Sequence, residues 1–201
     1  MNHPEPLPDT GVARIGPNAI IRVAEALQAS DGPAAEVFAA AGLSHYLTQP
    51  PAAMVLETEV IALQQALRAT LDRAAASAVN LDAGRRTGDY LLAVRIPKAA
   101  QRVLRLLPPR PAARLLLKAV GQHAWTFAGS GRFDCEAGQP LRVTIADCPT
   151  CRGASAGFPV CDFYCGAFER LFQTLVSPRA RVQEVACGAM GAAACVFEIT
   201  W

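Results

Sequence analysis

The C-terminal stretch of the chain, residues 180–200, reads ARVQEVACGAMGAAACVFEIT. Apolar and polar residues alternate in residues 180–186 and again in residues 194–200, which is the period of a half-buried β-strand. Gly188, Gly191 and the small residues between them can form a turn. The stretch therefore predicts a β-hairpin with Cys187 and Cys195 at the inner ends of its two strands.

Three cysteines and one glutamate form a pattern around this hairpin, with the spacing C-x22-E-x2-C-x7-C. Thiolates are soft ligands that suit zinc, and a carboxylate can complete a tetrahedral set. Buried cysteines also occur simply as small apolar residues, so the spacing leaves both interpretations open. The candidate zinc ligands are Cys161, Glu184, Cys187 and Cys195.

A second cysteine motif precedes the first. Cys148 and Cys151 have the spacing of a metal-binding pair, and Cys161 and Cys165 follow them. The resulting C-x2-C-x9-C-x3-C pattern could hold an iron–sulfur cluster or a second zinc ion, and the first pair could instead be a redox-active dithiol. The sequence leaves these alternatives open.

Helical periodicity dominates the first two thirds of the chain and gives way to strands in the last third. The predicted helices cover residues 17–29, 33–41, 57–81, 87–96, 97–107, 112–127 and 163–176, with Gly84 as a stop. The predicted strands cover residues 132–135, 141–145 and the two arms of the hairpin. This order predicts an α+β fold in which N-terminal helices pack on a small antiparallel sheet.

The length of 201 residues fits a single domain, and 52% hydrophobic residues can supply its core. We expect a disordered proline-rich arm over residues 1–14 and one domain over residues 15–201. Within that domain we expect a helical part, residues 15–128, and a zinc-bearing α+β part, residues 129–201.

The chain begins without the basic and apolar segments of a secretory signal. No apolar run approaches the roughly 20 residues needed to span a bilayer. Seven cysteines without an export signal indicate a reducing compartment. We therefore expect a cytoplasmic protein.

The net charge of +2 conceals a basic stripe. Residues 85–118 contain nine Lys or Arg and one Asp, so the stripe carries +8 and the remainder −6. Such a stripe can meet nucleic acid, an anionic membrane surface or a ligand with carboxylates, or it can be a solvated helix face. Tyr90 is its one aromatic residue, which argues against single-stranded nucleic acid bound by stacking.

Two further motifs bear on cofactors. His123 and Trp125 follow the stripe, and a histidine beside aromatic faces could ligate the metal of a bound macrocycle or could simply stabilise a helix end. Gly129 and Gly131 resemble the start of a dinucleotide fingerprint, but they follow a predicted helix and Asp134 stands at the third glycine position. We expect no Rossmann cofactor site.

Two segments resemble one family. The pattern of Cys161–Phe163, Glu184–Gly191 and Cys195–Ile199 resembles the 4-vinyl-reductase domain. The middle segment, from Ile96 to Phe133, resembles the bacteriochlorophyll-biosynthesis branch of that family, the bacteriochlorophyll 4-vinyl reductases. The resemblance covers roughly residues 12–201. It departs at residues 190–193, where the wider domain often has a lysine and an aspartate, and this leaves the ligand positions untouched.

The resemblance implies a fold similar to haem-based nitric-oxide sensors and trafficking-complex subunits, with a structural zinc ion on the matching glutamate and three cysteines. It also implies a role in bacteriochlorophyll biosynthesis. The family name implies vinyl reduction, yet no dinucleotide motif is visible and zinc has no redox activity. We therefore expect a carrier for a Mg-tetrapyrrole, of the Mg-protoporphyrin monoester or divinyl protochlorophyllide type, that assists 8-vinyl reduction or later steps. The alternative is a genuine 4-vinyl reductase with an iron–sulfur cluster or an external electron donor.

The resemblance also suggests where the tetrapyrrole binds. Basic side chains would meet its carboxylates and His123 would be the axial ligand of its metal, while no catalytic residue is assigned. The expected binding residues are Lys98, Arg102, Arg105, Arg114, His123 and Trp125. The expected partners are bacteriochlorophyll-pathway enzymes and no nucleic acid, with room for a homodimer and for peripheral contact with the photosynthetic membrane surface.

Overall fold

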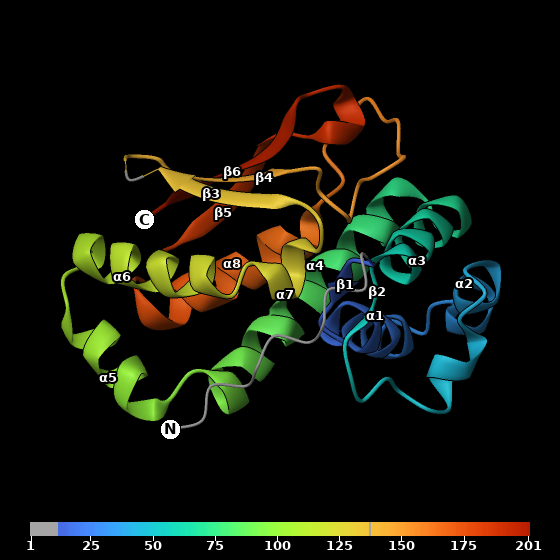
Figure 1. Ribbon diagram of the computed structural model, residues 1–201, viewed down its shortest axis with the longest axis horizontal. Coiled ribbons are helices and arrows are strands. Elements are labelled where there is room, and N and C mark those ends of the chain that lie inside the picture. The colour runs from blue at the N-terminus through green and yellow to red at the C-terminus, as the bar shows by residue number, and fades with distance from the viewer. Residues whose placement is uncertain (1–11, 137) are drawn as a thin grey trace.

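The computed structural model describes residues 12–136 and 138–201 (Figure 1). Most of the proline-rich arm expected over residues 1–14 lies outside the described residues, and Arg14 already belongs to a short strand. Helices precede and flank a small antiparallel sheet, so the α+β class is confirmed. Among the described residues, no helix is both long and apolar enough to cross a bilayer.

The N-terminal elements gather around one long helix, α4. Helix α1 packs mainly on α4 and helix α2 on α3, so these helices cover α4 rather than the sheet. Strands β1 and β2 pair with each other in a separate two-stranded sheet. The elements are β1 (Arg14–Ile15), α1 (Asn18–Ala29), α2 (Ala34–Ala40), η1 (Ser44–Leu47), β2 (Val55–Leu56), α3 (Glu57–Thr70) and α4 (Arg73–Tyr90).

The basic stripe folds into a series of helices divided by prolines. Pro97 and Pro108 each stand directly before a helix or at its first turn, where proline is tolerated. The elements are the π-helix η2 (Leu91–Arg95), α5 (Lys98–Leu106), α6 (Pro109–Gln122) and α7 (Trp125–Ala128).

The main sheet has the strand order β3-β4-β6-β5, and all its neighbours are antiparallel. The predicted C-terminal hairpin is confirmed: β5 pairs with β6, and a short 3-10 turn joins them. Figure 1 shows α6 and α8 along one face of this sheet. The elements are β3 (Arg132–Glu136), β4 (Leu141–Ala146), α8 (Asp162–Leu175), β5 (Arg181–Ala186), η3 (Gly188–Met190) and β6 (Ala194–Thr200).

The prediction that Gly84 ends a helix is wrong. The predicted helix over residues 57–81 is two helices, and the second begins after Asp72, whose side chain accepts a hydrogen bond from the Ala75 amide at 2.9 Å. Helix α4 then continues through Gly84 to Tyr90. Gly84 serves packing instead, because a Cβ there would overlap the carbonyl oxygen of Phe163 in α8.

The same close approach recurs on the facing helix, where a Cβ on Gly166 would overlap the carbonyl oxygen of Leu81. Two glycines therefore allow α4 and α8 to cross with their backbones in near contact. Overpacking such a contact costs about 1–3 kcal/mol. We expect Gly84→Ala and Gly166→Ala each to lower the free energy of unfolding by at least this amount, measured by urea denaturation.

Gly121→Ala is the matched control, since Gly121 also lies in a helix but its new Cβ would stand 3.5 Å from the Phe133 ring, an ordinary contact. Replacing this glycine should leave stability unchanged or raise it by up to about 1 kcal/mol. Full stability of the Gly84→Ala protein would contradict the close crossing.

Candidate functional site

Five buried cysteines from different segments meet in one cluster. Cys148 and Cys151 lie in the turn after β4, and Cys161 occupies the N-cap of α8. Cys187 directly follows β5, and Cys195 lies on β6. The β4–β6 pairing places Cys195 opposite the C-terminal end of β4, beside the turn that carries the first two cysteines.

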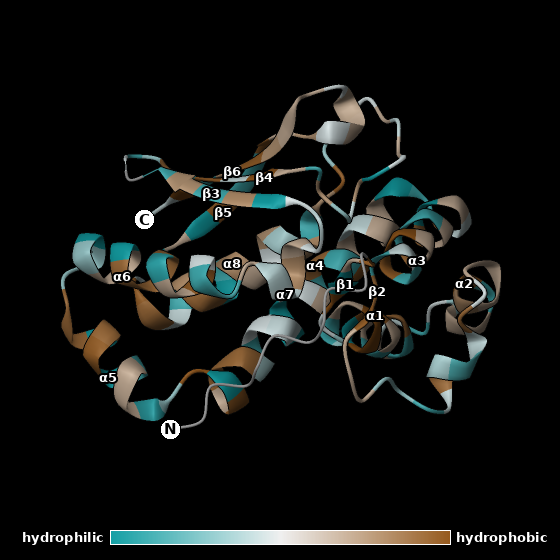
Figure 2. Cartoon of the chain, viewed as in Figure 1, coloured by the Kyte–Doolittle hydropathy of each residue, from teal (hydrophilic) through white to brown (hydrophobic). Residues whose placement is uncertain are grey.

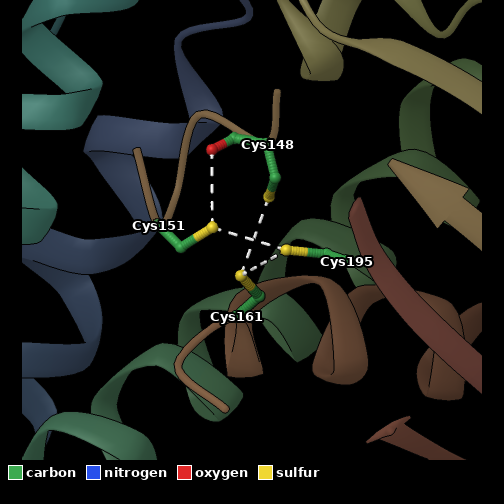
Figure 3. Close-up of side chains that lie close together, drawn as sticks. All are labelled: Cys148, Cys151, Cys161 and Cys195. Atoms are coloured by element: carbon green, nitrogen blue, oxygen red, sulfur yellow. Dashed lines mark hydrogen bonds between the residues drawn. The ribbon is translucent and has the colours of Figure 1, made fainter. Parts of the chain in front are cut away.

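Four of the sulfurs point toward one another (Figure 3). The Sγ atoms of Cys148 and Cys161 are 3.6 Å apart, and those of Cys151 and Cys195 are 3.4 Å apart. The Sγ atoms of Cys161 and Cys195 are separated by 3.6 Å. Since Zn–S bonds are about 2.3 Å long, a tetrahedral zinc ion separates its sulfurs by about 3.8 Å. The spacing therefore fits four thiolates around one metal ion.

A second set of donors adjoins the first. The Cys187 Sγ lies 3.9 Å from the Sγ atoms of both Cys161 and Cys195. With Glu184 these three cysteines form a group whose ligand atoms all lie within 4.8 Å of one another, as do those of the first set. The structure therefore brings together the four zinc ligands expected from the sequence, and the two sets share Cys161 and Cys195.

Glu184 is a buried carboxylate with only part of its hydrogen-bonding capacity used. Its side chain is on a residue 7% exposed, and Oε2 accepts a hydrogen bond from the Cys161 amide at 2.8 Å. Within the described part of the chain, Oε1 has no hydrogen-bond partner. Burial raises the pKa of this carboxyl to about 9. A buried oxygen without a partner is costly, and it fits a donor that is completed by a metal ion.

The surroundings of the sulfurs favour thiolates. The N-terminus of α8 places the positive end of its dipole at Cys161. The Gly188 amide donates to the Cys195 Sγ at 3.4 Å. The hydrogen bond of Cys151 with Cys148 raises the pKa of the Cys151 thiol, but those with Cys161, Cys187 and Cys195 outweigh it and lower that pKa to about 4.

Cys165 lies apart from this cluster. It stands about one helical turn after Cys161 in α8, and neither donor group formed by the described residues includes it. Burial raises the pKa of its thiol, which lies in the wall of a neighbouring cavity. Cys195 therefore joins Cys148, Cys151 and Cys161 in the place that the sequence suggested for Cys165.

A cavity of about 560 Å³ adjoins the cluster, lined by α3, α4, the loop before α8, α8 and β5. Glu184 belongs both to its wall and to the second donor set. Three arginines also line it. Arg68 donates from Nη1 to the Thr150 carbonyl at 2.8 Å, while its buried Nη2 has no partner among residues 12–136 and 138–201.

The other two arginines stand at exposed positions on α4. The Arg73 guanidinium lies 3.9 Å from the centroid of the Phe158 ring, and an Arg85 nitrogen is 3.3 Å from a Glu169 oxygen. A buried guanidinium, two exposed ones and an aromatic wall form a site that suits an anionic ligand with an apolar body.

The six residues expected to bind a tetrapyrrole lie elsewhere, on α5, α6 and α7, and none is among the residues that line this cavity. Lys98 and Arg105 donate to the carbonyls of Leu92 and Thr174, both at 3.2 Å. Arg114 borders a smaller hollow of about 280 Å³. Figure 1 shows α5 and α7 at opposite ends of α6, so these six residues are spread along an edge of the molecule.

His123 is exposed at the C-terminal end of α6. Its Nδ1 lies 3.0 Å from the Ala119 carbonyl, the position of an N–H donor that satisfies the helix end. Trp125 is 61% exposed on α7. The contact of His123 is that of a helix-capping residue, and its use as an axial ligand stays a prediction.

Sequence reasoning missed the arginines and the aromatic residue of the cavity. Arg68, Arg73 and Phe158 belong to no motif, and they are separated by as many as ninety residues. Only the packing of α3, α4 and the loop before α8 brings them together. The Cys148-x2-Cys151 spacing was a usable signal, although it could not name the remaining ligands.

Comparison with known proteins places the chain in a family. Residues 141–201 match the family model of the vinyl-4-reductase domain. The "bacteriochlorophyll synthase 23 kDa chain" of Cereibacter sphaeroides is 45% identical over 188 residues, which cover 92% of this chain and 90% of that protein. The protein of the same name from Rhodobacter capsulatus is 40% identical over 199 residues, covering 98% and 92%.

A solved structure of a vinyl-4-reductase family protein from Methanocaldococcus jannaschii is 17% identical and aligns with a TM-score of 0.33 over 56% of this chain and 72% of that chain. The assignment therefore depends on the domain match and the two close relatives. By that identity and coverage, the chain belongs to the family of the bacteriochlorophyll synthase 23 kDa chains and carries a vinyl-4-reductase domain in its C-terminal third.

Proposed function

We propose that the protein serves bacteriochlorophyll synthesis as a carrier that binds a Mg-tetrapyrrole intermediate. The names of the two close relatives support the pathway. The cavity supports the binding role, because three arginines line it and one of them keeps a buried nitrogen without a partner in the described chain. We assign the ligand to this cavity.

The expected ligand joins a large apolar ring to a carboxylate. A volume of about 560 Å³ lies within the range of roughly 300–1,000 Å³ typical of small-molecule sites. Leu81, Phe158 and Val160 offer apolar surface to the ring. Arginine binds carboxylates in a bidentate manner, and Arg68 and Arg73 are the donors that we assign to this contact.

The surface of α5 supports a second element of the carrier role, which is contact with the partner that receives the ligand. Val103 and Leu106 are 51% and 86% exposed, beside the basic Arg102 and Arg105 (Figure 2). Exposed apolar groups within a basic helix suit an anionic membrane surface. We therefore assign α5 to docking at the photosynthetic membrane, where pathway enzymes would take up the ligand.

A carrier and a reductase differ in what they release. A carrier releases the tetrapyrrole with its vinyl group intact, whereas a reductase adds two electrons and two protons to that group from a donor. Conversion of vinyl to ethyl by the purified protein with a chemical reductant or a reduced nicotinamide would favour the reductase. Recovery of unchanged ligand under these conditions favours the carrier.

Titration with Mg-protoporphyrin monomethyl ester or divinyl protochlorophyllide tests the assigned site. We expect a saturable shift of the Soret band. Arg73→Gln should weaken binding roughly tenfold, because it removes one charge-assisted contact. Arg102→Gln is the matched control, since it removes the same charge from another exposed helix position and should leave the affinity unchanged.

Two results would contradict the proposal. Absence of saturable binding would reject the carrier role. Binding that is weakened by Arg102→Gln and by His123→Ala, but not by Arg73→Gln, would move the ligand to the α5–α7 surface that the sequence suggested.

We also propose that the cysteine cluster binds zinc and that this zinc is structural. The donors are buried and come from the turn after β4, α8 and the C-terminal hairpin, so a bound ion would tie these segments together. Ligand binding stabilises a fold by about 4 kcal/mol when the free ligand exceeds its dissociation constant 1,000-fold.

Removal of the metal by a strong chelator under reducing conditions should therefore lower the free energy of unfolding by about this amount. Cys195→Ser should abolish metal binding, because Cys195 belongs to both donor sets, and should yield insoluble protein. Cys135→Ser, at a half-buried position outside the cluster, should retain the metal and the stability. Stability that is indifferent to the chelator would rule out a structural metal.

A further inference from the structure

The cluster holds more donors than one metal ion can use. A tetrahedral ion binds four ligands, yet six donor residues from two overlapping groups are gathered here. One ion in either group leaves two buried donors unused. These would be Glu184 and Cys187 in one case, and Cys148 and Cys151 in the other.

We propose that the cluster is a binuclear site for two divalent metal ions of the zinc class, bridged by two thiolates. The bridging ligands are Cys161 and Cys195, the residues common to both groups. Cys148 and Cys151 complete the first ion, and Glu184 and Cys187 complete the second.

The sulfur positions suit this arrangement. The two shared Sγ atoms are 3.6 Å apart, which leaves room for one ion on each side of the line that joins them. With metal–sulfur bonds of about 2.3–2.4 Å, the two ions would stand about 3 Å apart. Cys148 and Cys151 each lie within 3.6 Å of one shared sulfur, and Cys187 lies 3.9 Å from both.

The second ion explains the unpartnered oxygen of Glu184. This carboxylate is more than nine-tenths buried, and its Oε1 has no hydrogen-bond partner in the described chain. An ion held by the first group alone would leave that oxygen unpaired. An ion held by the second group alone would leave Cys148 and Cys151, each 4% exposed, as buried thiols in a turn with metal-binding spacing.

Charge also favours two ions. Five thiolates and one carboxylate around one divalent ion carry a net charge of −4, and a second ion reduces this to −2. The N-terminus of α8 at Cys161 and the Arg68 guanidinium, bonded to the Thr150 carbonyl between Cys148 and Cys151, offset the remainder. Soft thiolate ligands indicate zinc rather than magnesium or calcium.

Metal analysis of the reduced, full-length protein saturated with Zn²⁺ and examined by native mass spectrometry tests the proposal. We expect two zinc ions per chain. The double variant Cys148→Ser/Cys151→Ser and the double variant Glu184→Gln/Cys187→Ser should each retain one, and Cys195→Ser should retain none. Cys135→Ser should retain two.

A second measurement uses the unaltered protein, so it does not depend on the folding of any variant. After substitution with ¹¹³Cd²⁺, we expect two cadmium resonances that are coupled to each other through the bridging sulfurs. One ion per chain at saturating Zn²⁺, or two resonances without mutual coupling, would overturn the bridged site. Two ions whose number is unchanged in both double variants would overturn the assignment of its ligands.

Discussion

The close crossing of α4 and α8 is the contact on which the site depends. Gly84 and Gly166 let the two helix backbones approach without intervening side chains. That approach determines where α8 begins, and Cys161 occupies its N-cap. Since Cys161 belongs to both donor sets, a displacement of α8 would move a ligand of each. The same two helices also form walls of the cavity, so one packing contact positions both features.

The cluster and the cavity are connected through shared residues. Glu184 stands in the cavity wall and belongs to a donor set. Arg68 lines the cavity and also bonds to the Thr150 carbonyl, in the turn that carries Cys148 and Cys151. A ligand carboxylate at Arg68 would therefore contact a side chain that supports two of the thiolates. Through this geometry the proposed metal and the proposed ligand would be coupled, although they use different atoms.

The basic stripe shows how tertiary structure divides one compositional feature into several roles. Lys98 and Arg105 use their charged groups on backbone carbonyls within the fold. Arg85 borders the cavity, while Arg102 is exposed on α5. Composition predicted an anion-binding surface, but it could not separate these positions, because the orientation of each helix is determined by its packing against distant segments.

The sequence by itself determined the order of helices and strands, the C-terminal hairpin and the donor set around it, because these follow from local periodicity and spacing. Only the tertiary structure decided that Cys195 rather than Cys165 joins Cys148 and Cys151. Cys195 is 44 residues from Cys151, and the antiparallel pairing of β4 with β6 brings it to their turn. Cys165, although near Cys161 in sequence, lies in the cavity wall. Contacts between distant segments arise from packing, for which the spacing of residues along the chain carries no signal.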